Sequence, residues 1–300
     1  MQRASSNNKA LIYVNIAVLL FGLVGLFAKS ITLSALEMTF WRVLFSSMAL
    51  AVFMIITGQN FLLRSKKDVL IIISAGVVLA LHWWSFLGAI QISTVAIGTI
   101  TFSSFPLFVT FLEPLVFHGK LKLKNIIIAL IILAGVSITV PEFSLENKYS
   151  MGILVGMFST FLYAVMAIFN KFLSQKYSST LTAFYEQVIA AFVLLPLVFY
   201  EWSRQGRLNI NEILPDTNNL IFLLMLGIIT TALAHTLFIS SLKYIPAQLA
   251  GVLSSMETVY GIIMAVIFLG EVPSVREVTG AIIIIGTVLY TQLQQVGVRK

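Results

Sequence analysis

Long apolar stretches, separated by short polar interruptions, set the pattern of this chain. Each stretch approaches the roughly 20 residues that a helix needs to cross a hydrocarbon core of about 30 Å. Inside that core the backbone must satisfy its own hydrogen bonds, and an uninterrupted apolar segment does so as a helix. We therefore predict ten membrane-spanning helices, at residues 10–28, 35–57, 69–90, 94–117, 123–140, 151–173, 180–200, 220–241, 247–269 and 275–292.

The length and period of the stretches exclude two other interpretations. Strands of outer-membrane barrels alternate apolar and polar residues over about 10 positions, and these stretches do not. A signal peptide has an apolar region of about 7–15 residues followed by a small-residue cleavage site. The first stretch is longer and has no such site before Lys29, so we interpret it as an uncleaved membrane helix.

Composition agrees with a membrane protein and narrows its chemistry. The chain is 59% apolar and 10% charged, whereas a soluble domain carries about 25% charged residues. The net charge of +7 comes from residues at the ends of apolar stretches rather than from a basic patch, so no nucleic-acid partner is expected. With 0 cysteines and 3 widely separated histidines, we predict no metal site and no cofactor.

The distribution of basic residues predicts the orientation. Thirteen of the 19 lysines and arginines fall on the side that holds both chain ends, five fall on the other side, and Arg42 lies within a span. Basic loops favour the cytoplasm, so both termini are predicted to be cytoplasmic, as an even number of spans requires. We expect a multi-pass protein of a bacterial inner (cytoplasmic) membrane.

The two halves of the chain resemble each other. The matches are separated by 151 to 153 residues and keep their order, pairing Gly98 with Gly251, Gly119 with Gly270, Gly135 with Gly286 and His82 with His235. The repeat contains five spans, an odd number, so the second copy must enter the membrane from the opposite side. The predicted fold is therefore an all-α integral membrane protein of ten transmembrane helices, built as two inverted five-helix repeats at residues 1–145 and 146–300.

Several short motifs carry a family resemblance that covers essentially the whole chain. They are Phe40-Trp41-Arg42, Leu112-Glu113-Pro114, Leu269-Gly270-Glu271-Val272-Pro273, and Gly280 with Gly286. The chain resembles the drug/metabolite transporter superfamily, in its EamA-like form with ten spans. The first half departs from the Leu-Gly-Glu turn, since His118-Gly119-Lys120 stands there. The resemblance implies transport of a small organic solute, often proton-coupled or facilitated.

Four charged residues lie away from the ends of the predicted spans: Arg42, Glu113, Glu186 and Glu257. Charges at mid-bilayer cost about 2.5–3.5 kcal/mol on insertion scales and therefore face a protein interior or a cavity. Glu257 lies between small polar residues and is a candidate for a solute amine or a proton, or for a buried interhelical bond. Arg42 either pairs with its repeat equivalent Glu186 or extends its charge outward. Arg42, Glu113 and Glu186 are candidates for coupling or gating.

Aromatic and polar residues within the spans supply a candidate substrate site. His82-Trp83-Trp84 could line an aromatic cavity for organic cations, or could simply pack between helices. Successive helical residues point about 100° apart, so at most two of the three share a face. The substrate-binding residues that we predict are His82, Trp83, Trp84, Ser104, Tyr163, His235, Glu257 and Tyr260. Histidine could also carry a coupled proton.

These patterns predict a secondary transporter of amino acids, related metabolites or drug-like compounds, and the family resemblance favours export. The two halves would rock around a midplane cavity lined by spans 1, 3, 4, 6, 8 and 9. A channel-like facilitator of the same solutes is the first alternative. An intramembrane enzyme is the second, although the chain contains no H-E-x-x-H, G-x-S-x-G or P-loop pattern. The expected partners are a small solute and the lipid bilayer, with protons as a candidate coupling ion. A monomer and a homodimer both remain open, because Gly280 and Gly286 fit either.

Overall fold

The computed structural model is helical and describes residues 2–138, 147–270 and 272–297. The helices of the first half are α1 (Gln2–Phe21), α2 (Val24–Ser30), α3 (Ala35–Ile56), α4 (Lys66–Ile92), α5 (Val95–Phe102), α6 (Phe105–Phe117) and α7 (Leu123–Ile138). Those of the second half are α8 (Lys148–Leu173), α9 (Ser179–Arg204), α10 (Ile210–Ile213), α11 (Thr217–Gly227), α12 (Ala234–Leu242), α13 (Ala247–Ser254), α14 (Met256–Met264) and α15 (Val275–Gly297), with π-helical turns η1 (Ile228–Leu233) and η2 (Ala265–Leu269).

The helices occupy the ten predicted spans. Eight helical stretches among the described residues are long and apolar enough to cross a membrane, and α7 is a shorter apolar helix. Helix α15 fills the tenth predicted span. The predicted all-α architecture of two five-helix repeats is confirmed. The predicted boundary between residues 145 and 146 lies outside the described residues. Glu271 of the second-half motif also lies outside them.

Most long helices begin at a side chain that caps their free N–H groups. Ser34 accepts a hydrogen bond from Glu37 N at the start of α3, and Thr94 accepts one from Ile97 N at the start of α5. Such caps satisfy donors that have no partner within the helix. Helix α13 differs, because its N-cap is Pro246, whose side chain offers no acceptor.

Three of the ten spans are interrupted within their length. Span 1 breaks between α1 and α2, span 4 breaks at Ser103 and Ser104, and span 9 breaks at Ser255. Pro106 lies in the first turn of α6, where its missing N–H costs nothing. Span 4 therefore breaks just before Pro106, and the break at Ser255 lies at the equivalent position of the second half.

The inverted repeat is visible in the contacts of two equivalent lysines. Lys29 Nζ donates to Ser93 O (3.4 Å), at the end of α4. Lys171 Nζ donates to Leu242 O and Ile245 O (both 2.6 Å), at the end of α12. Each lysine thus binds the carbonyl end of the third helix in its own repeat, where a cation is favourable.

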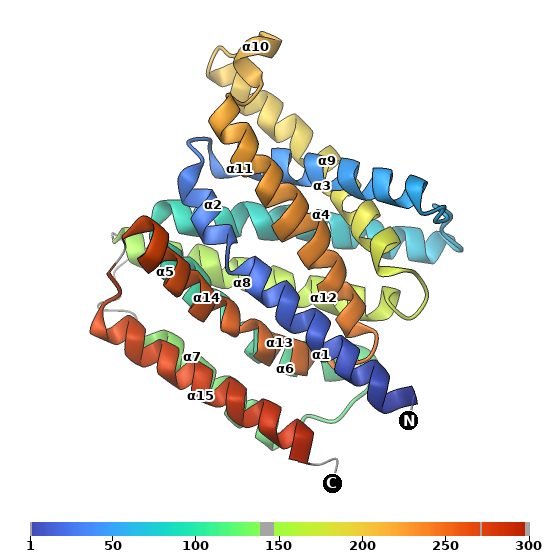
Figure 1. Cartoon of the computed structure of the whole chain (residues 1–300), viewed down its shortest axis with the longest axis vertical. Coiled ribbons are helices and arrows are strands. Elements are labelled where there is room, and N and C mark those ends of the chain that lie inside the picture. The colour runs from blue at the N-terminus through green and yellow to red at the C-terminus, as the bar shows by residue number, and fades with distance from the viewer. Residues whose placement is uncertain (1, 139–146, 271, 298–300) are drawn as a thin grey trace.

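The repeats interlock rather than sit side by side. Helices α7 and α15 pack together at one edge of the molecule, while α3 and α9 pack together toward the opposite edge (Figure 1). Spans 5 and 10 are therefore peripheral. Helices α4 and α8, one from each half, pack extensively against each other, which brings the middle of several spans around one interior point.

Candidate functional site

A small enclosed pocket lies among the middles of these spans. Its polar lining comes from Arg42 on α3, His82 on α4, Tyr163 on α8 and Glu257 on α14, and its apolar lining includes Trp83, Phe86 and Phe102. Its volume is about 20 Å³, which is room for one water molecule. The structure is therefore closed around this point.

Arg42 is buried in the pocket wall without a carboxylate in direct contact. Its Nε donates to Thr231 Oγ1 (2.9 Å), and its guanidinium carbon lies 4.1 Å from the ring centre of Trp83. Its Nη1 has no hydrogen-bond partner among the described residues. The prediction that Arg42 pairs with Glu186 or extends outward is wrong, because Glu186 bonds His235 instead and Arg42 is only 1% exposed.

Glu257 lines the same pocket from the second half. It lies in the first turn of α14, immediately after the break in span 9, and is buried. Its neighbour Thr258 donates to Thr99 O (2.7 Å) and shares a hydrogen bond with Ser103 Oγ (2.5 Å). These bonds join the two broken spans, so Glu257 and Arg42 face one pocket within electrostatic range of each other.

His82 and Tyr163 form the aromatic side of the pocket. His82 Nδ1 lies 2.9 Å from Ser159 O and 2.8 Å from Ser159 Oγ, which holds the imidazole between α4 and α8. The rings of His82 and Tyr163 have centroids 4.8 Å apart. The Tyr163 hydroxyl is buried and has no partner within the described part of the chain, so it can serve a bound solute.

Glu186 and His235 form a buried pair next to the pocket. His235 Nε2 lies 2.7 Å from Glu186 Oε2, and both side chains are 0% exposed. The Trp83 ring meets the His235 ring edge-on at 5.6 Å. Trp83 therefore separates this pair from Arg42.

Of the eight predicted substrate residues, four line the pocket and His235 lies next to it, while the other three do not reach it. Trp84 is 36% exposed on the outer surface of α4, whereas Trp83 is 4% exposed. Ser104 Oγ donates to Thr101 O (2.6 Å) within its own turn. Tyr260 packs at the junction of α1 and α2, where a Cβ on Gly22 would lie 2.5 Å from Tyr260 Cβ. We leave these three out of the candidate site.

Glu113 lies far along α6 from the pocket and caps a helix of the other half. Its two carboxylate oxygens accept from Ala247 N (3.0 Å) and Gln248 N (2.9 Å), the first donors of α13. Asn125 Nδ2 also donates to Gln248 Oε1. Glu113 thus supplies the cap that the side chain of Pro246 cannot. Its contact joins the two halves of the chain at the end of the bundle that holds the start of α1.

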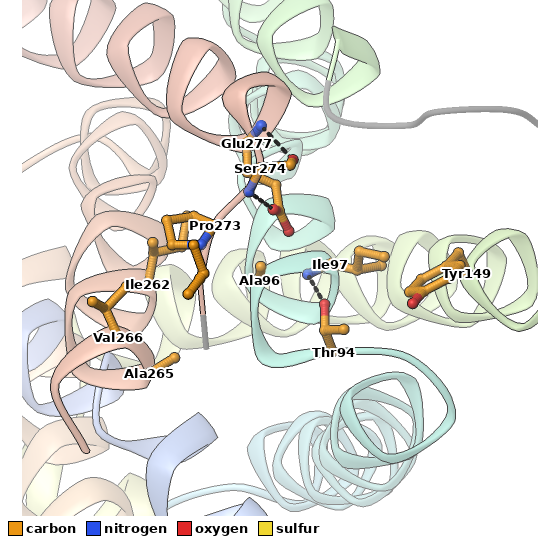
Figure 2. A pocket seen from close by; sticks show the side chains of 11 residues that line it. Thr94, Ala96, Ile97, Tyr149, Ile262, Ala265, Val266, Pro273, Ser274 and Glu277 are labelled. Atoms are coloured by element: carbon orange, nitrogen blue, oxygen red, sulfur yellow. Dashed lines mark hydrogen bonds between the residues drawn. The ribbon is translucent and has the colours of Figure 1, made fainter. Parts of the chain in front are cut away.

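Two outer pockets lie at opposite ends of the bundle and correspond under the repeat. One, of about 120 Å³, is lined by Thr110, Asn125 and Leu249 beside the Glu113 contact. The other, of about 440 Å³, lies between α5, α14, η2 and α15. Figure 2 shows Ile262 and Val266 facing Ala96 and Ile97 across it. Residues 264 to 266, which align with Glu113, are apolar, so the larger pocket has no matching carboxylate.

A sequence profile of the EamA-like transporter family matches the chain twice, at residues 8–140 and 150–292. The chain belongs to the EamA-like transporter family. It is accordingly a membrane transporter and not an enzyme. The family resemblance drawn from the sequence motifs is confirmed.

Relatives of this EamA-like chain include proteins named as transporters. The uncharacterized transporter YxxF of Bacillus subtilis (strain 168) is 22% identical over 298 residues, covering 98% of this chain and 93% of that protein. The S-adenosylmethionine uptake transporter of Rickettsia conorii is 24% identical over 258 residues, covering 86% of this chain and 83% of that protein. One protein of known crystal structure has a TM-score of 0.75 at 16% identity, over 98% of this chain and 99% of that one, which shows the fold alone.

Sequence reasoning missed several residues that shape the pocket of this EamA-like transporter. Thr231 and Ser159 bind Arg42 and His82, yet a lone threonine or serine in an apolar span gives no signal of its partner. In the sequence, Phe86 and Phe102 look like ordinary apolar residues of a membrane helix. Span 2 was left out of the predicted cavity, although Arg42 on that span lines it.

Proposed function

We propose that this chain is a secondary transporter of small organic solutes that bear a cationic group, such as amino acids and related sulfonium compounds. The observation that carries the proposal is one closed pocket lined by a buried cation, a buried carboxylate and a free hydroxyl: Arg42, Glu257 and Tyr163. Charged groups are costly in a bilayer and cluster where a solute passes. The name of the rickettsial relatives supports a solute of this class.

The lining suggests how such a solute binds. Its carboxylate would accept from the unpaired Nη1 of Arg42, and its cationic group would face Glu257. The rings of Trp83 and Phe102 would contact the cation through their faces, an interaction of about 2 kcal/mol in a site without water. The pocket must widen before a solute enters, since its present volume is about 20 Å³.

Transport would proceed by rocking of residues 1–145 against 146–300, in a bacterial inner membrane with both termini cytoplasmic. In that orientation the smaller outer pocket and the Glu113 contact face the cytoplasm, and the larger pocket faces outward. Glu113 would act as the cytoplasmic gate. Export stays a prediction, since the rickettsial relatives are named for uptake, and the same motion serves either direction.

A channel-like facilitator is supported less well. A pore needs a continuous path, whereas the central pocket is enclosed and has room for one water molecule. Alternating access explains both the closed centre and the unequal outer pockets.

Thermal unfolding of the purified protein tests the proposal. The panel contains S-adenosylmethionine, amino acids, nucleosides, sugar phosphates and organic cations. A ligand at about 100 times its Kd stabilises the folded state by about 2.7 kcal/mol. We expect a cationic or zwitterionic compound to raise Tm, and Glu257→Gln to weaken its binding by roughly thirtyfold, since a buried charge partner contributes about 2 kcal/mol or more.

Glu212→Gln is the matched control, because Glu212 is an exposed residue of the short helix α10, outside the spans. It should keep the full ligand response. Equal responses of the wild type and both variants to a bound solute would rule out Glu257 as its partner. Stabilisation by nucleosides or sugar phosphates alone would rule out the proposed solute class.

A further inference from the structure

We propose that the Glu186–His235 pair is the proton-binding site of this transporter, holding one proton that exchanges with water during the transport cycle. This proposal names the coupling ion of the proposed transporter. Only its account of the solute rests on the proposed function. Glu186 lies in the first third of α9, and His235 lies at the start of α12, in the last third of the span 217–242.

The pair is buried but incompletely bonded. Only Glu186 Oε2 and His235 Nε2 meet, at 2.7 Å, while Glu186 Oε1 and His235 Nδ1 have no hydrogen-bond partner among the residues that the structure describes. A purely structural polar pair in a dry interior is stable only when its remaining atoms are also bonded. The two open atoms are therefore available for a proton and for water when the halves separate.

Charge balance fixes the number of protons in the closed state. With one shared proton the pair is neutral overall, as either carboxylate and imidazolium or carboxylic acid and imidazole. Without that proton the pair carries one negative charge, which is costly in a low-dielectric interior unless a cation lies nearby. Entry of a cationic solute into the adjacent pocket supplies that cation, so solute binding favours release of the proton to water.

The surrounding helices place other titratable groups around the pair. Arg42 on α3, His82 on α4, Tyr163 on α8 and Glu257 on α14 all lie within electrostatic range of it or of each other. Arg42 and Glu257 both line the central pocket, whereas the Glu186–His235 pair lies beside that pocket, next to Trp83.

Trp83 provides the physical connection between proton and solute. Its ring meets His235 edge-on at 5.6 Å and lies 4.1 Å from the guanidinium carbon of Arg42. A solute that displaces Trp83 as the pocket widens must also move the imidazole. The proton site and the solute pocket therefore contact each other through Trp83, and movement at one site can affect the other.

Nitrogen-15 NMR of the purified, histidine-labelled protein tests the inference without a substrate. The chain has 3 histidines, and the two ring nitrogens of each imidazole are assigned with His82→Asn and His118→Asn. His118 lies exposed at the end of α6 and serves as the solvent-exposed reference. We expect the protonation of His235 to change with pH, because a proton-binding site must gain and lose its proton. Glu186→Gln should shift or abolish that change, and Glu212→Gln should leave it as in the wild type.

A His235 signal that stays constant while His118 titrates would overturn the proton site. So would a titration of His235 that is identical in the wild type and in Glu186→Gln. His235→Asn, checked for folding by size-exclusion chromatography, should remove the titrating signal altogether. These spectra need no ligand. A negative result from them would count against the proton site, whereas a solute panel without any stabilising compound would count against the proposed function.

Discussion

At the scale of single residues, two neighbouring tryptophans show that adjacent positions of one helix can lie inside and outside the site. Trp83 lies between Arg42 and His235 and is 4% exposed, while Trp84 is 36% exposed on the outside of α4. Successive residues of a helix point about 100° apart, so one ring faces the protein and the next faces lipid. The same residue type thus has two different energetic roles at adjacent positions.

Trp83→Phe should destabilise the protein more than Trp84→Phe does. The first change weakens the contact of the indole with the Arg42 guanidinium, which contributes about 1–2 kcal/mol when desolvated. The second changes an exposed position, where most substitutions stay within about 0.5 kcal/mol. Thermal unfolding of both variants without ligand measures the difference. Equal losses of Tm would contradict the assigned contact between Trp83 and Arg42.

The sequence could predict which residue types belong near the centre, but not which partners they find. Charges and histidines within apolar spans are conspicuous, and His82, Glu257 and Arg42 were singled out for that reason. Their partners depend on which helices are neighbours, which span order does not reveal. Arg42 therefore binds Thr231 rather than the predicted Glu186, because π-turn η1 brings Thr231 toward α3.

At the scale of elements, helix α13 depends on the opposite repeat for its first turn. Most long helices carry their own capping side chain, whereas Pro246 leaves the first donors of α13 to Glu113. A carboxylate at a helix N-terminus satisfies free N–H groups and interacts favourably with the helix dipole. The contact can therefore be broken as one unit when the halves move.

Removing this cap should open the end of the bundle that holds the start of α1. The chain has 0 cysteines, so a single introduced cysteine is the only thiol. Ala96 lines the larger outer pocket and Leu249, its repeat equivalent, lines the smaller one. We expect a soluble thiol reagent to label Ala96→Cys faster than Leu249→Cys, and Glu113→Ala to accelerate labelling at Leu249→Cys severalfold.

The Ala96→Cys rate serves as the control for that measurement. If Glu113→Ala accelerates both positions equally, the change has loosened the whole fold and Glu113 is not a gate. The cap costs about 0.5–2 kcal/mol when lost, which corresponds to a severalfold change in an opening equilibrium.

Among the elements, the spans and the break at Pro106 were predictable, but the π-helical turns were not. Apolar length and a proline leave clear marks in the sequence, since each follows from a single local rule. The turns η1 and η2 carry ordinary aliphatic and small polar residues. Their extra residue per turn is selected by packing against α3 and α14, which a single sequence does not contain.

At the scale of the whole molecule, ion pairs join the halves at both ends of one edge. Arg207 Nη1 lies 2.7 Å from Glu37 Oε1, and Lys176 Nζ lies 2.8 Å from Asp68 Oδ1. Both contacts lie on the side of α3, α4 and α9, whereas Glu113 binds the halves toward the other side. The α3–α9 edge is thus suited to act as the hinge of a rocking motion.

Labelling of intact cells tests the orientation of the whole molecule. Asn60 lies in the connection between α3 and α4 and Gln205 lies after α9, and both are exposed. An impermeant thiol reagent should label Gln205→Cys from outside and reach Asn60→Cys only after the cells are opened. The reverse result would place both termini outside and contradict the orientation predicted from basic residues.

Because of the π-helical turn η1, the position of His235 depends on the number of residues in this segment. It lies between α11 and α12, and in it Thr231 Oγ1 reaches back five residues to Leu226 O (2.7 Å). Loss of one residue there would restore an ordinary α-helix and rotate everything beyond it by about 100°. His235 would then turn away from Glu186, although no side chain had changed. We expect a one-residue deletion in this segment to be more harmful than a deletion in the connection 205–209. Descendants of this sequence are constrained here in the number of residues as well as in the identity of Thr231, which binds Arg42.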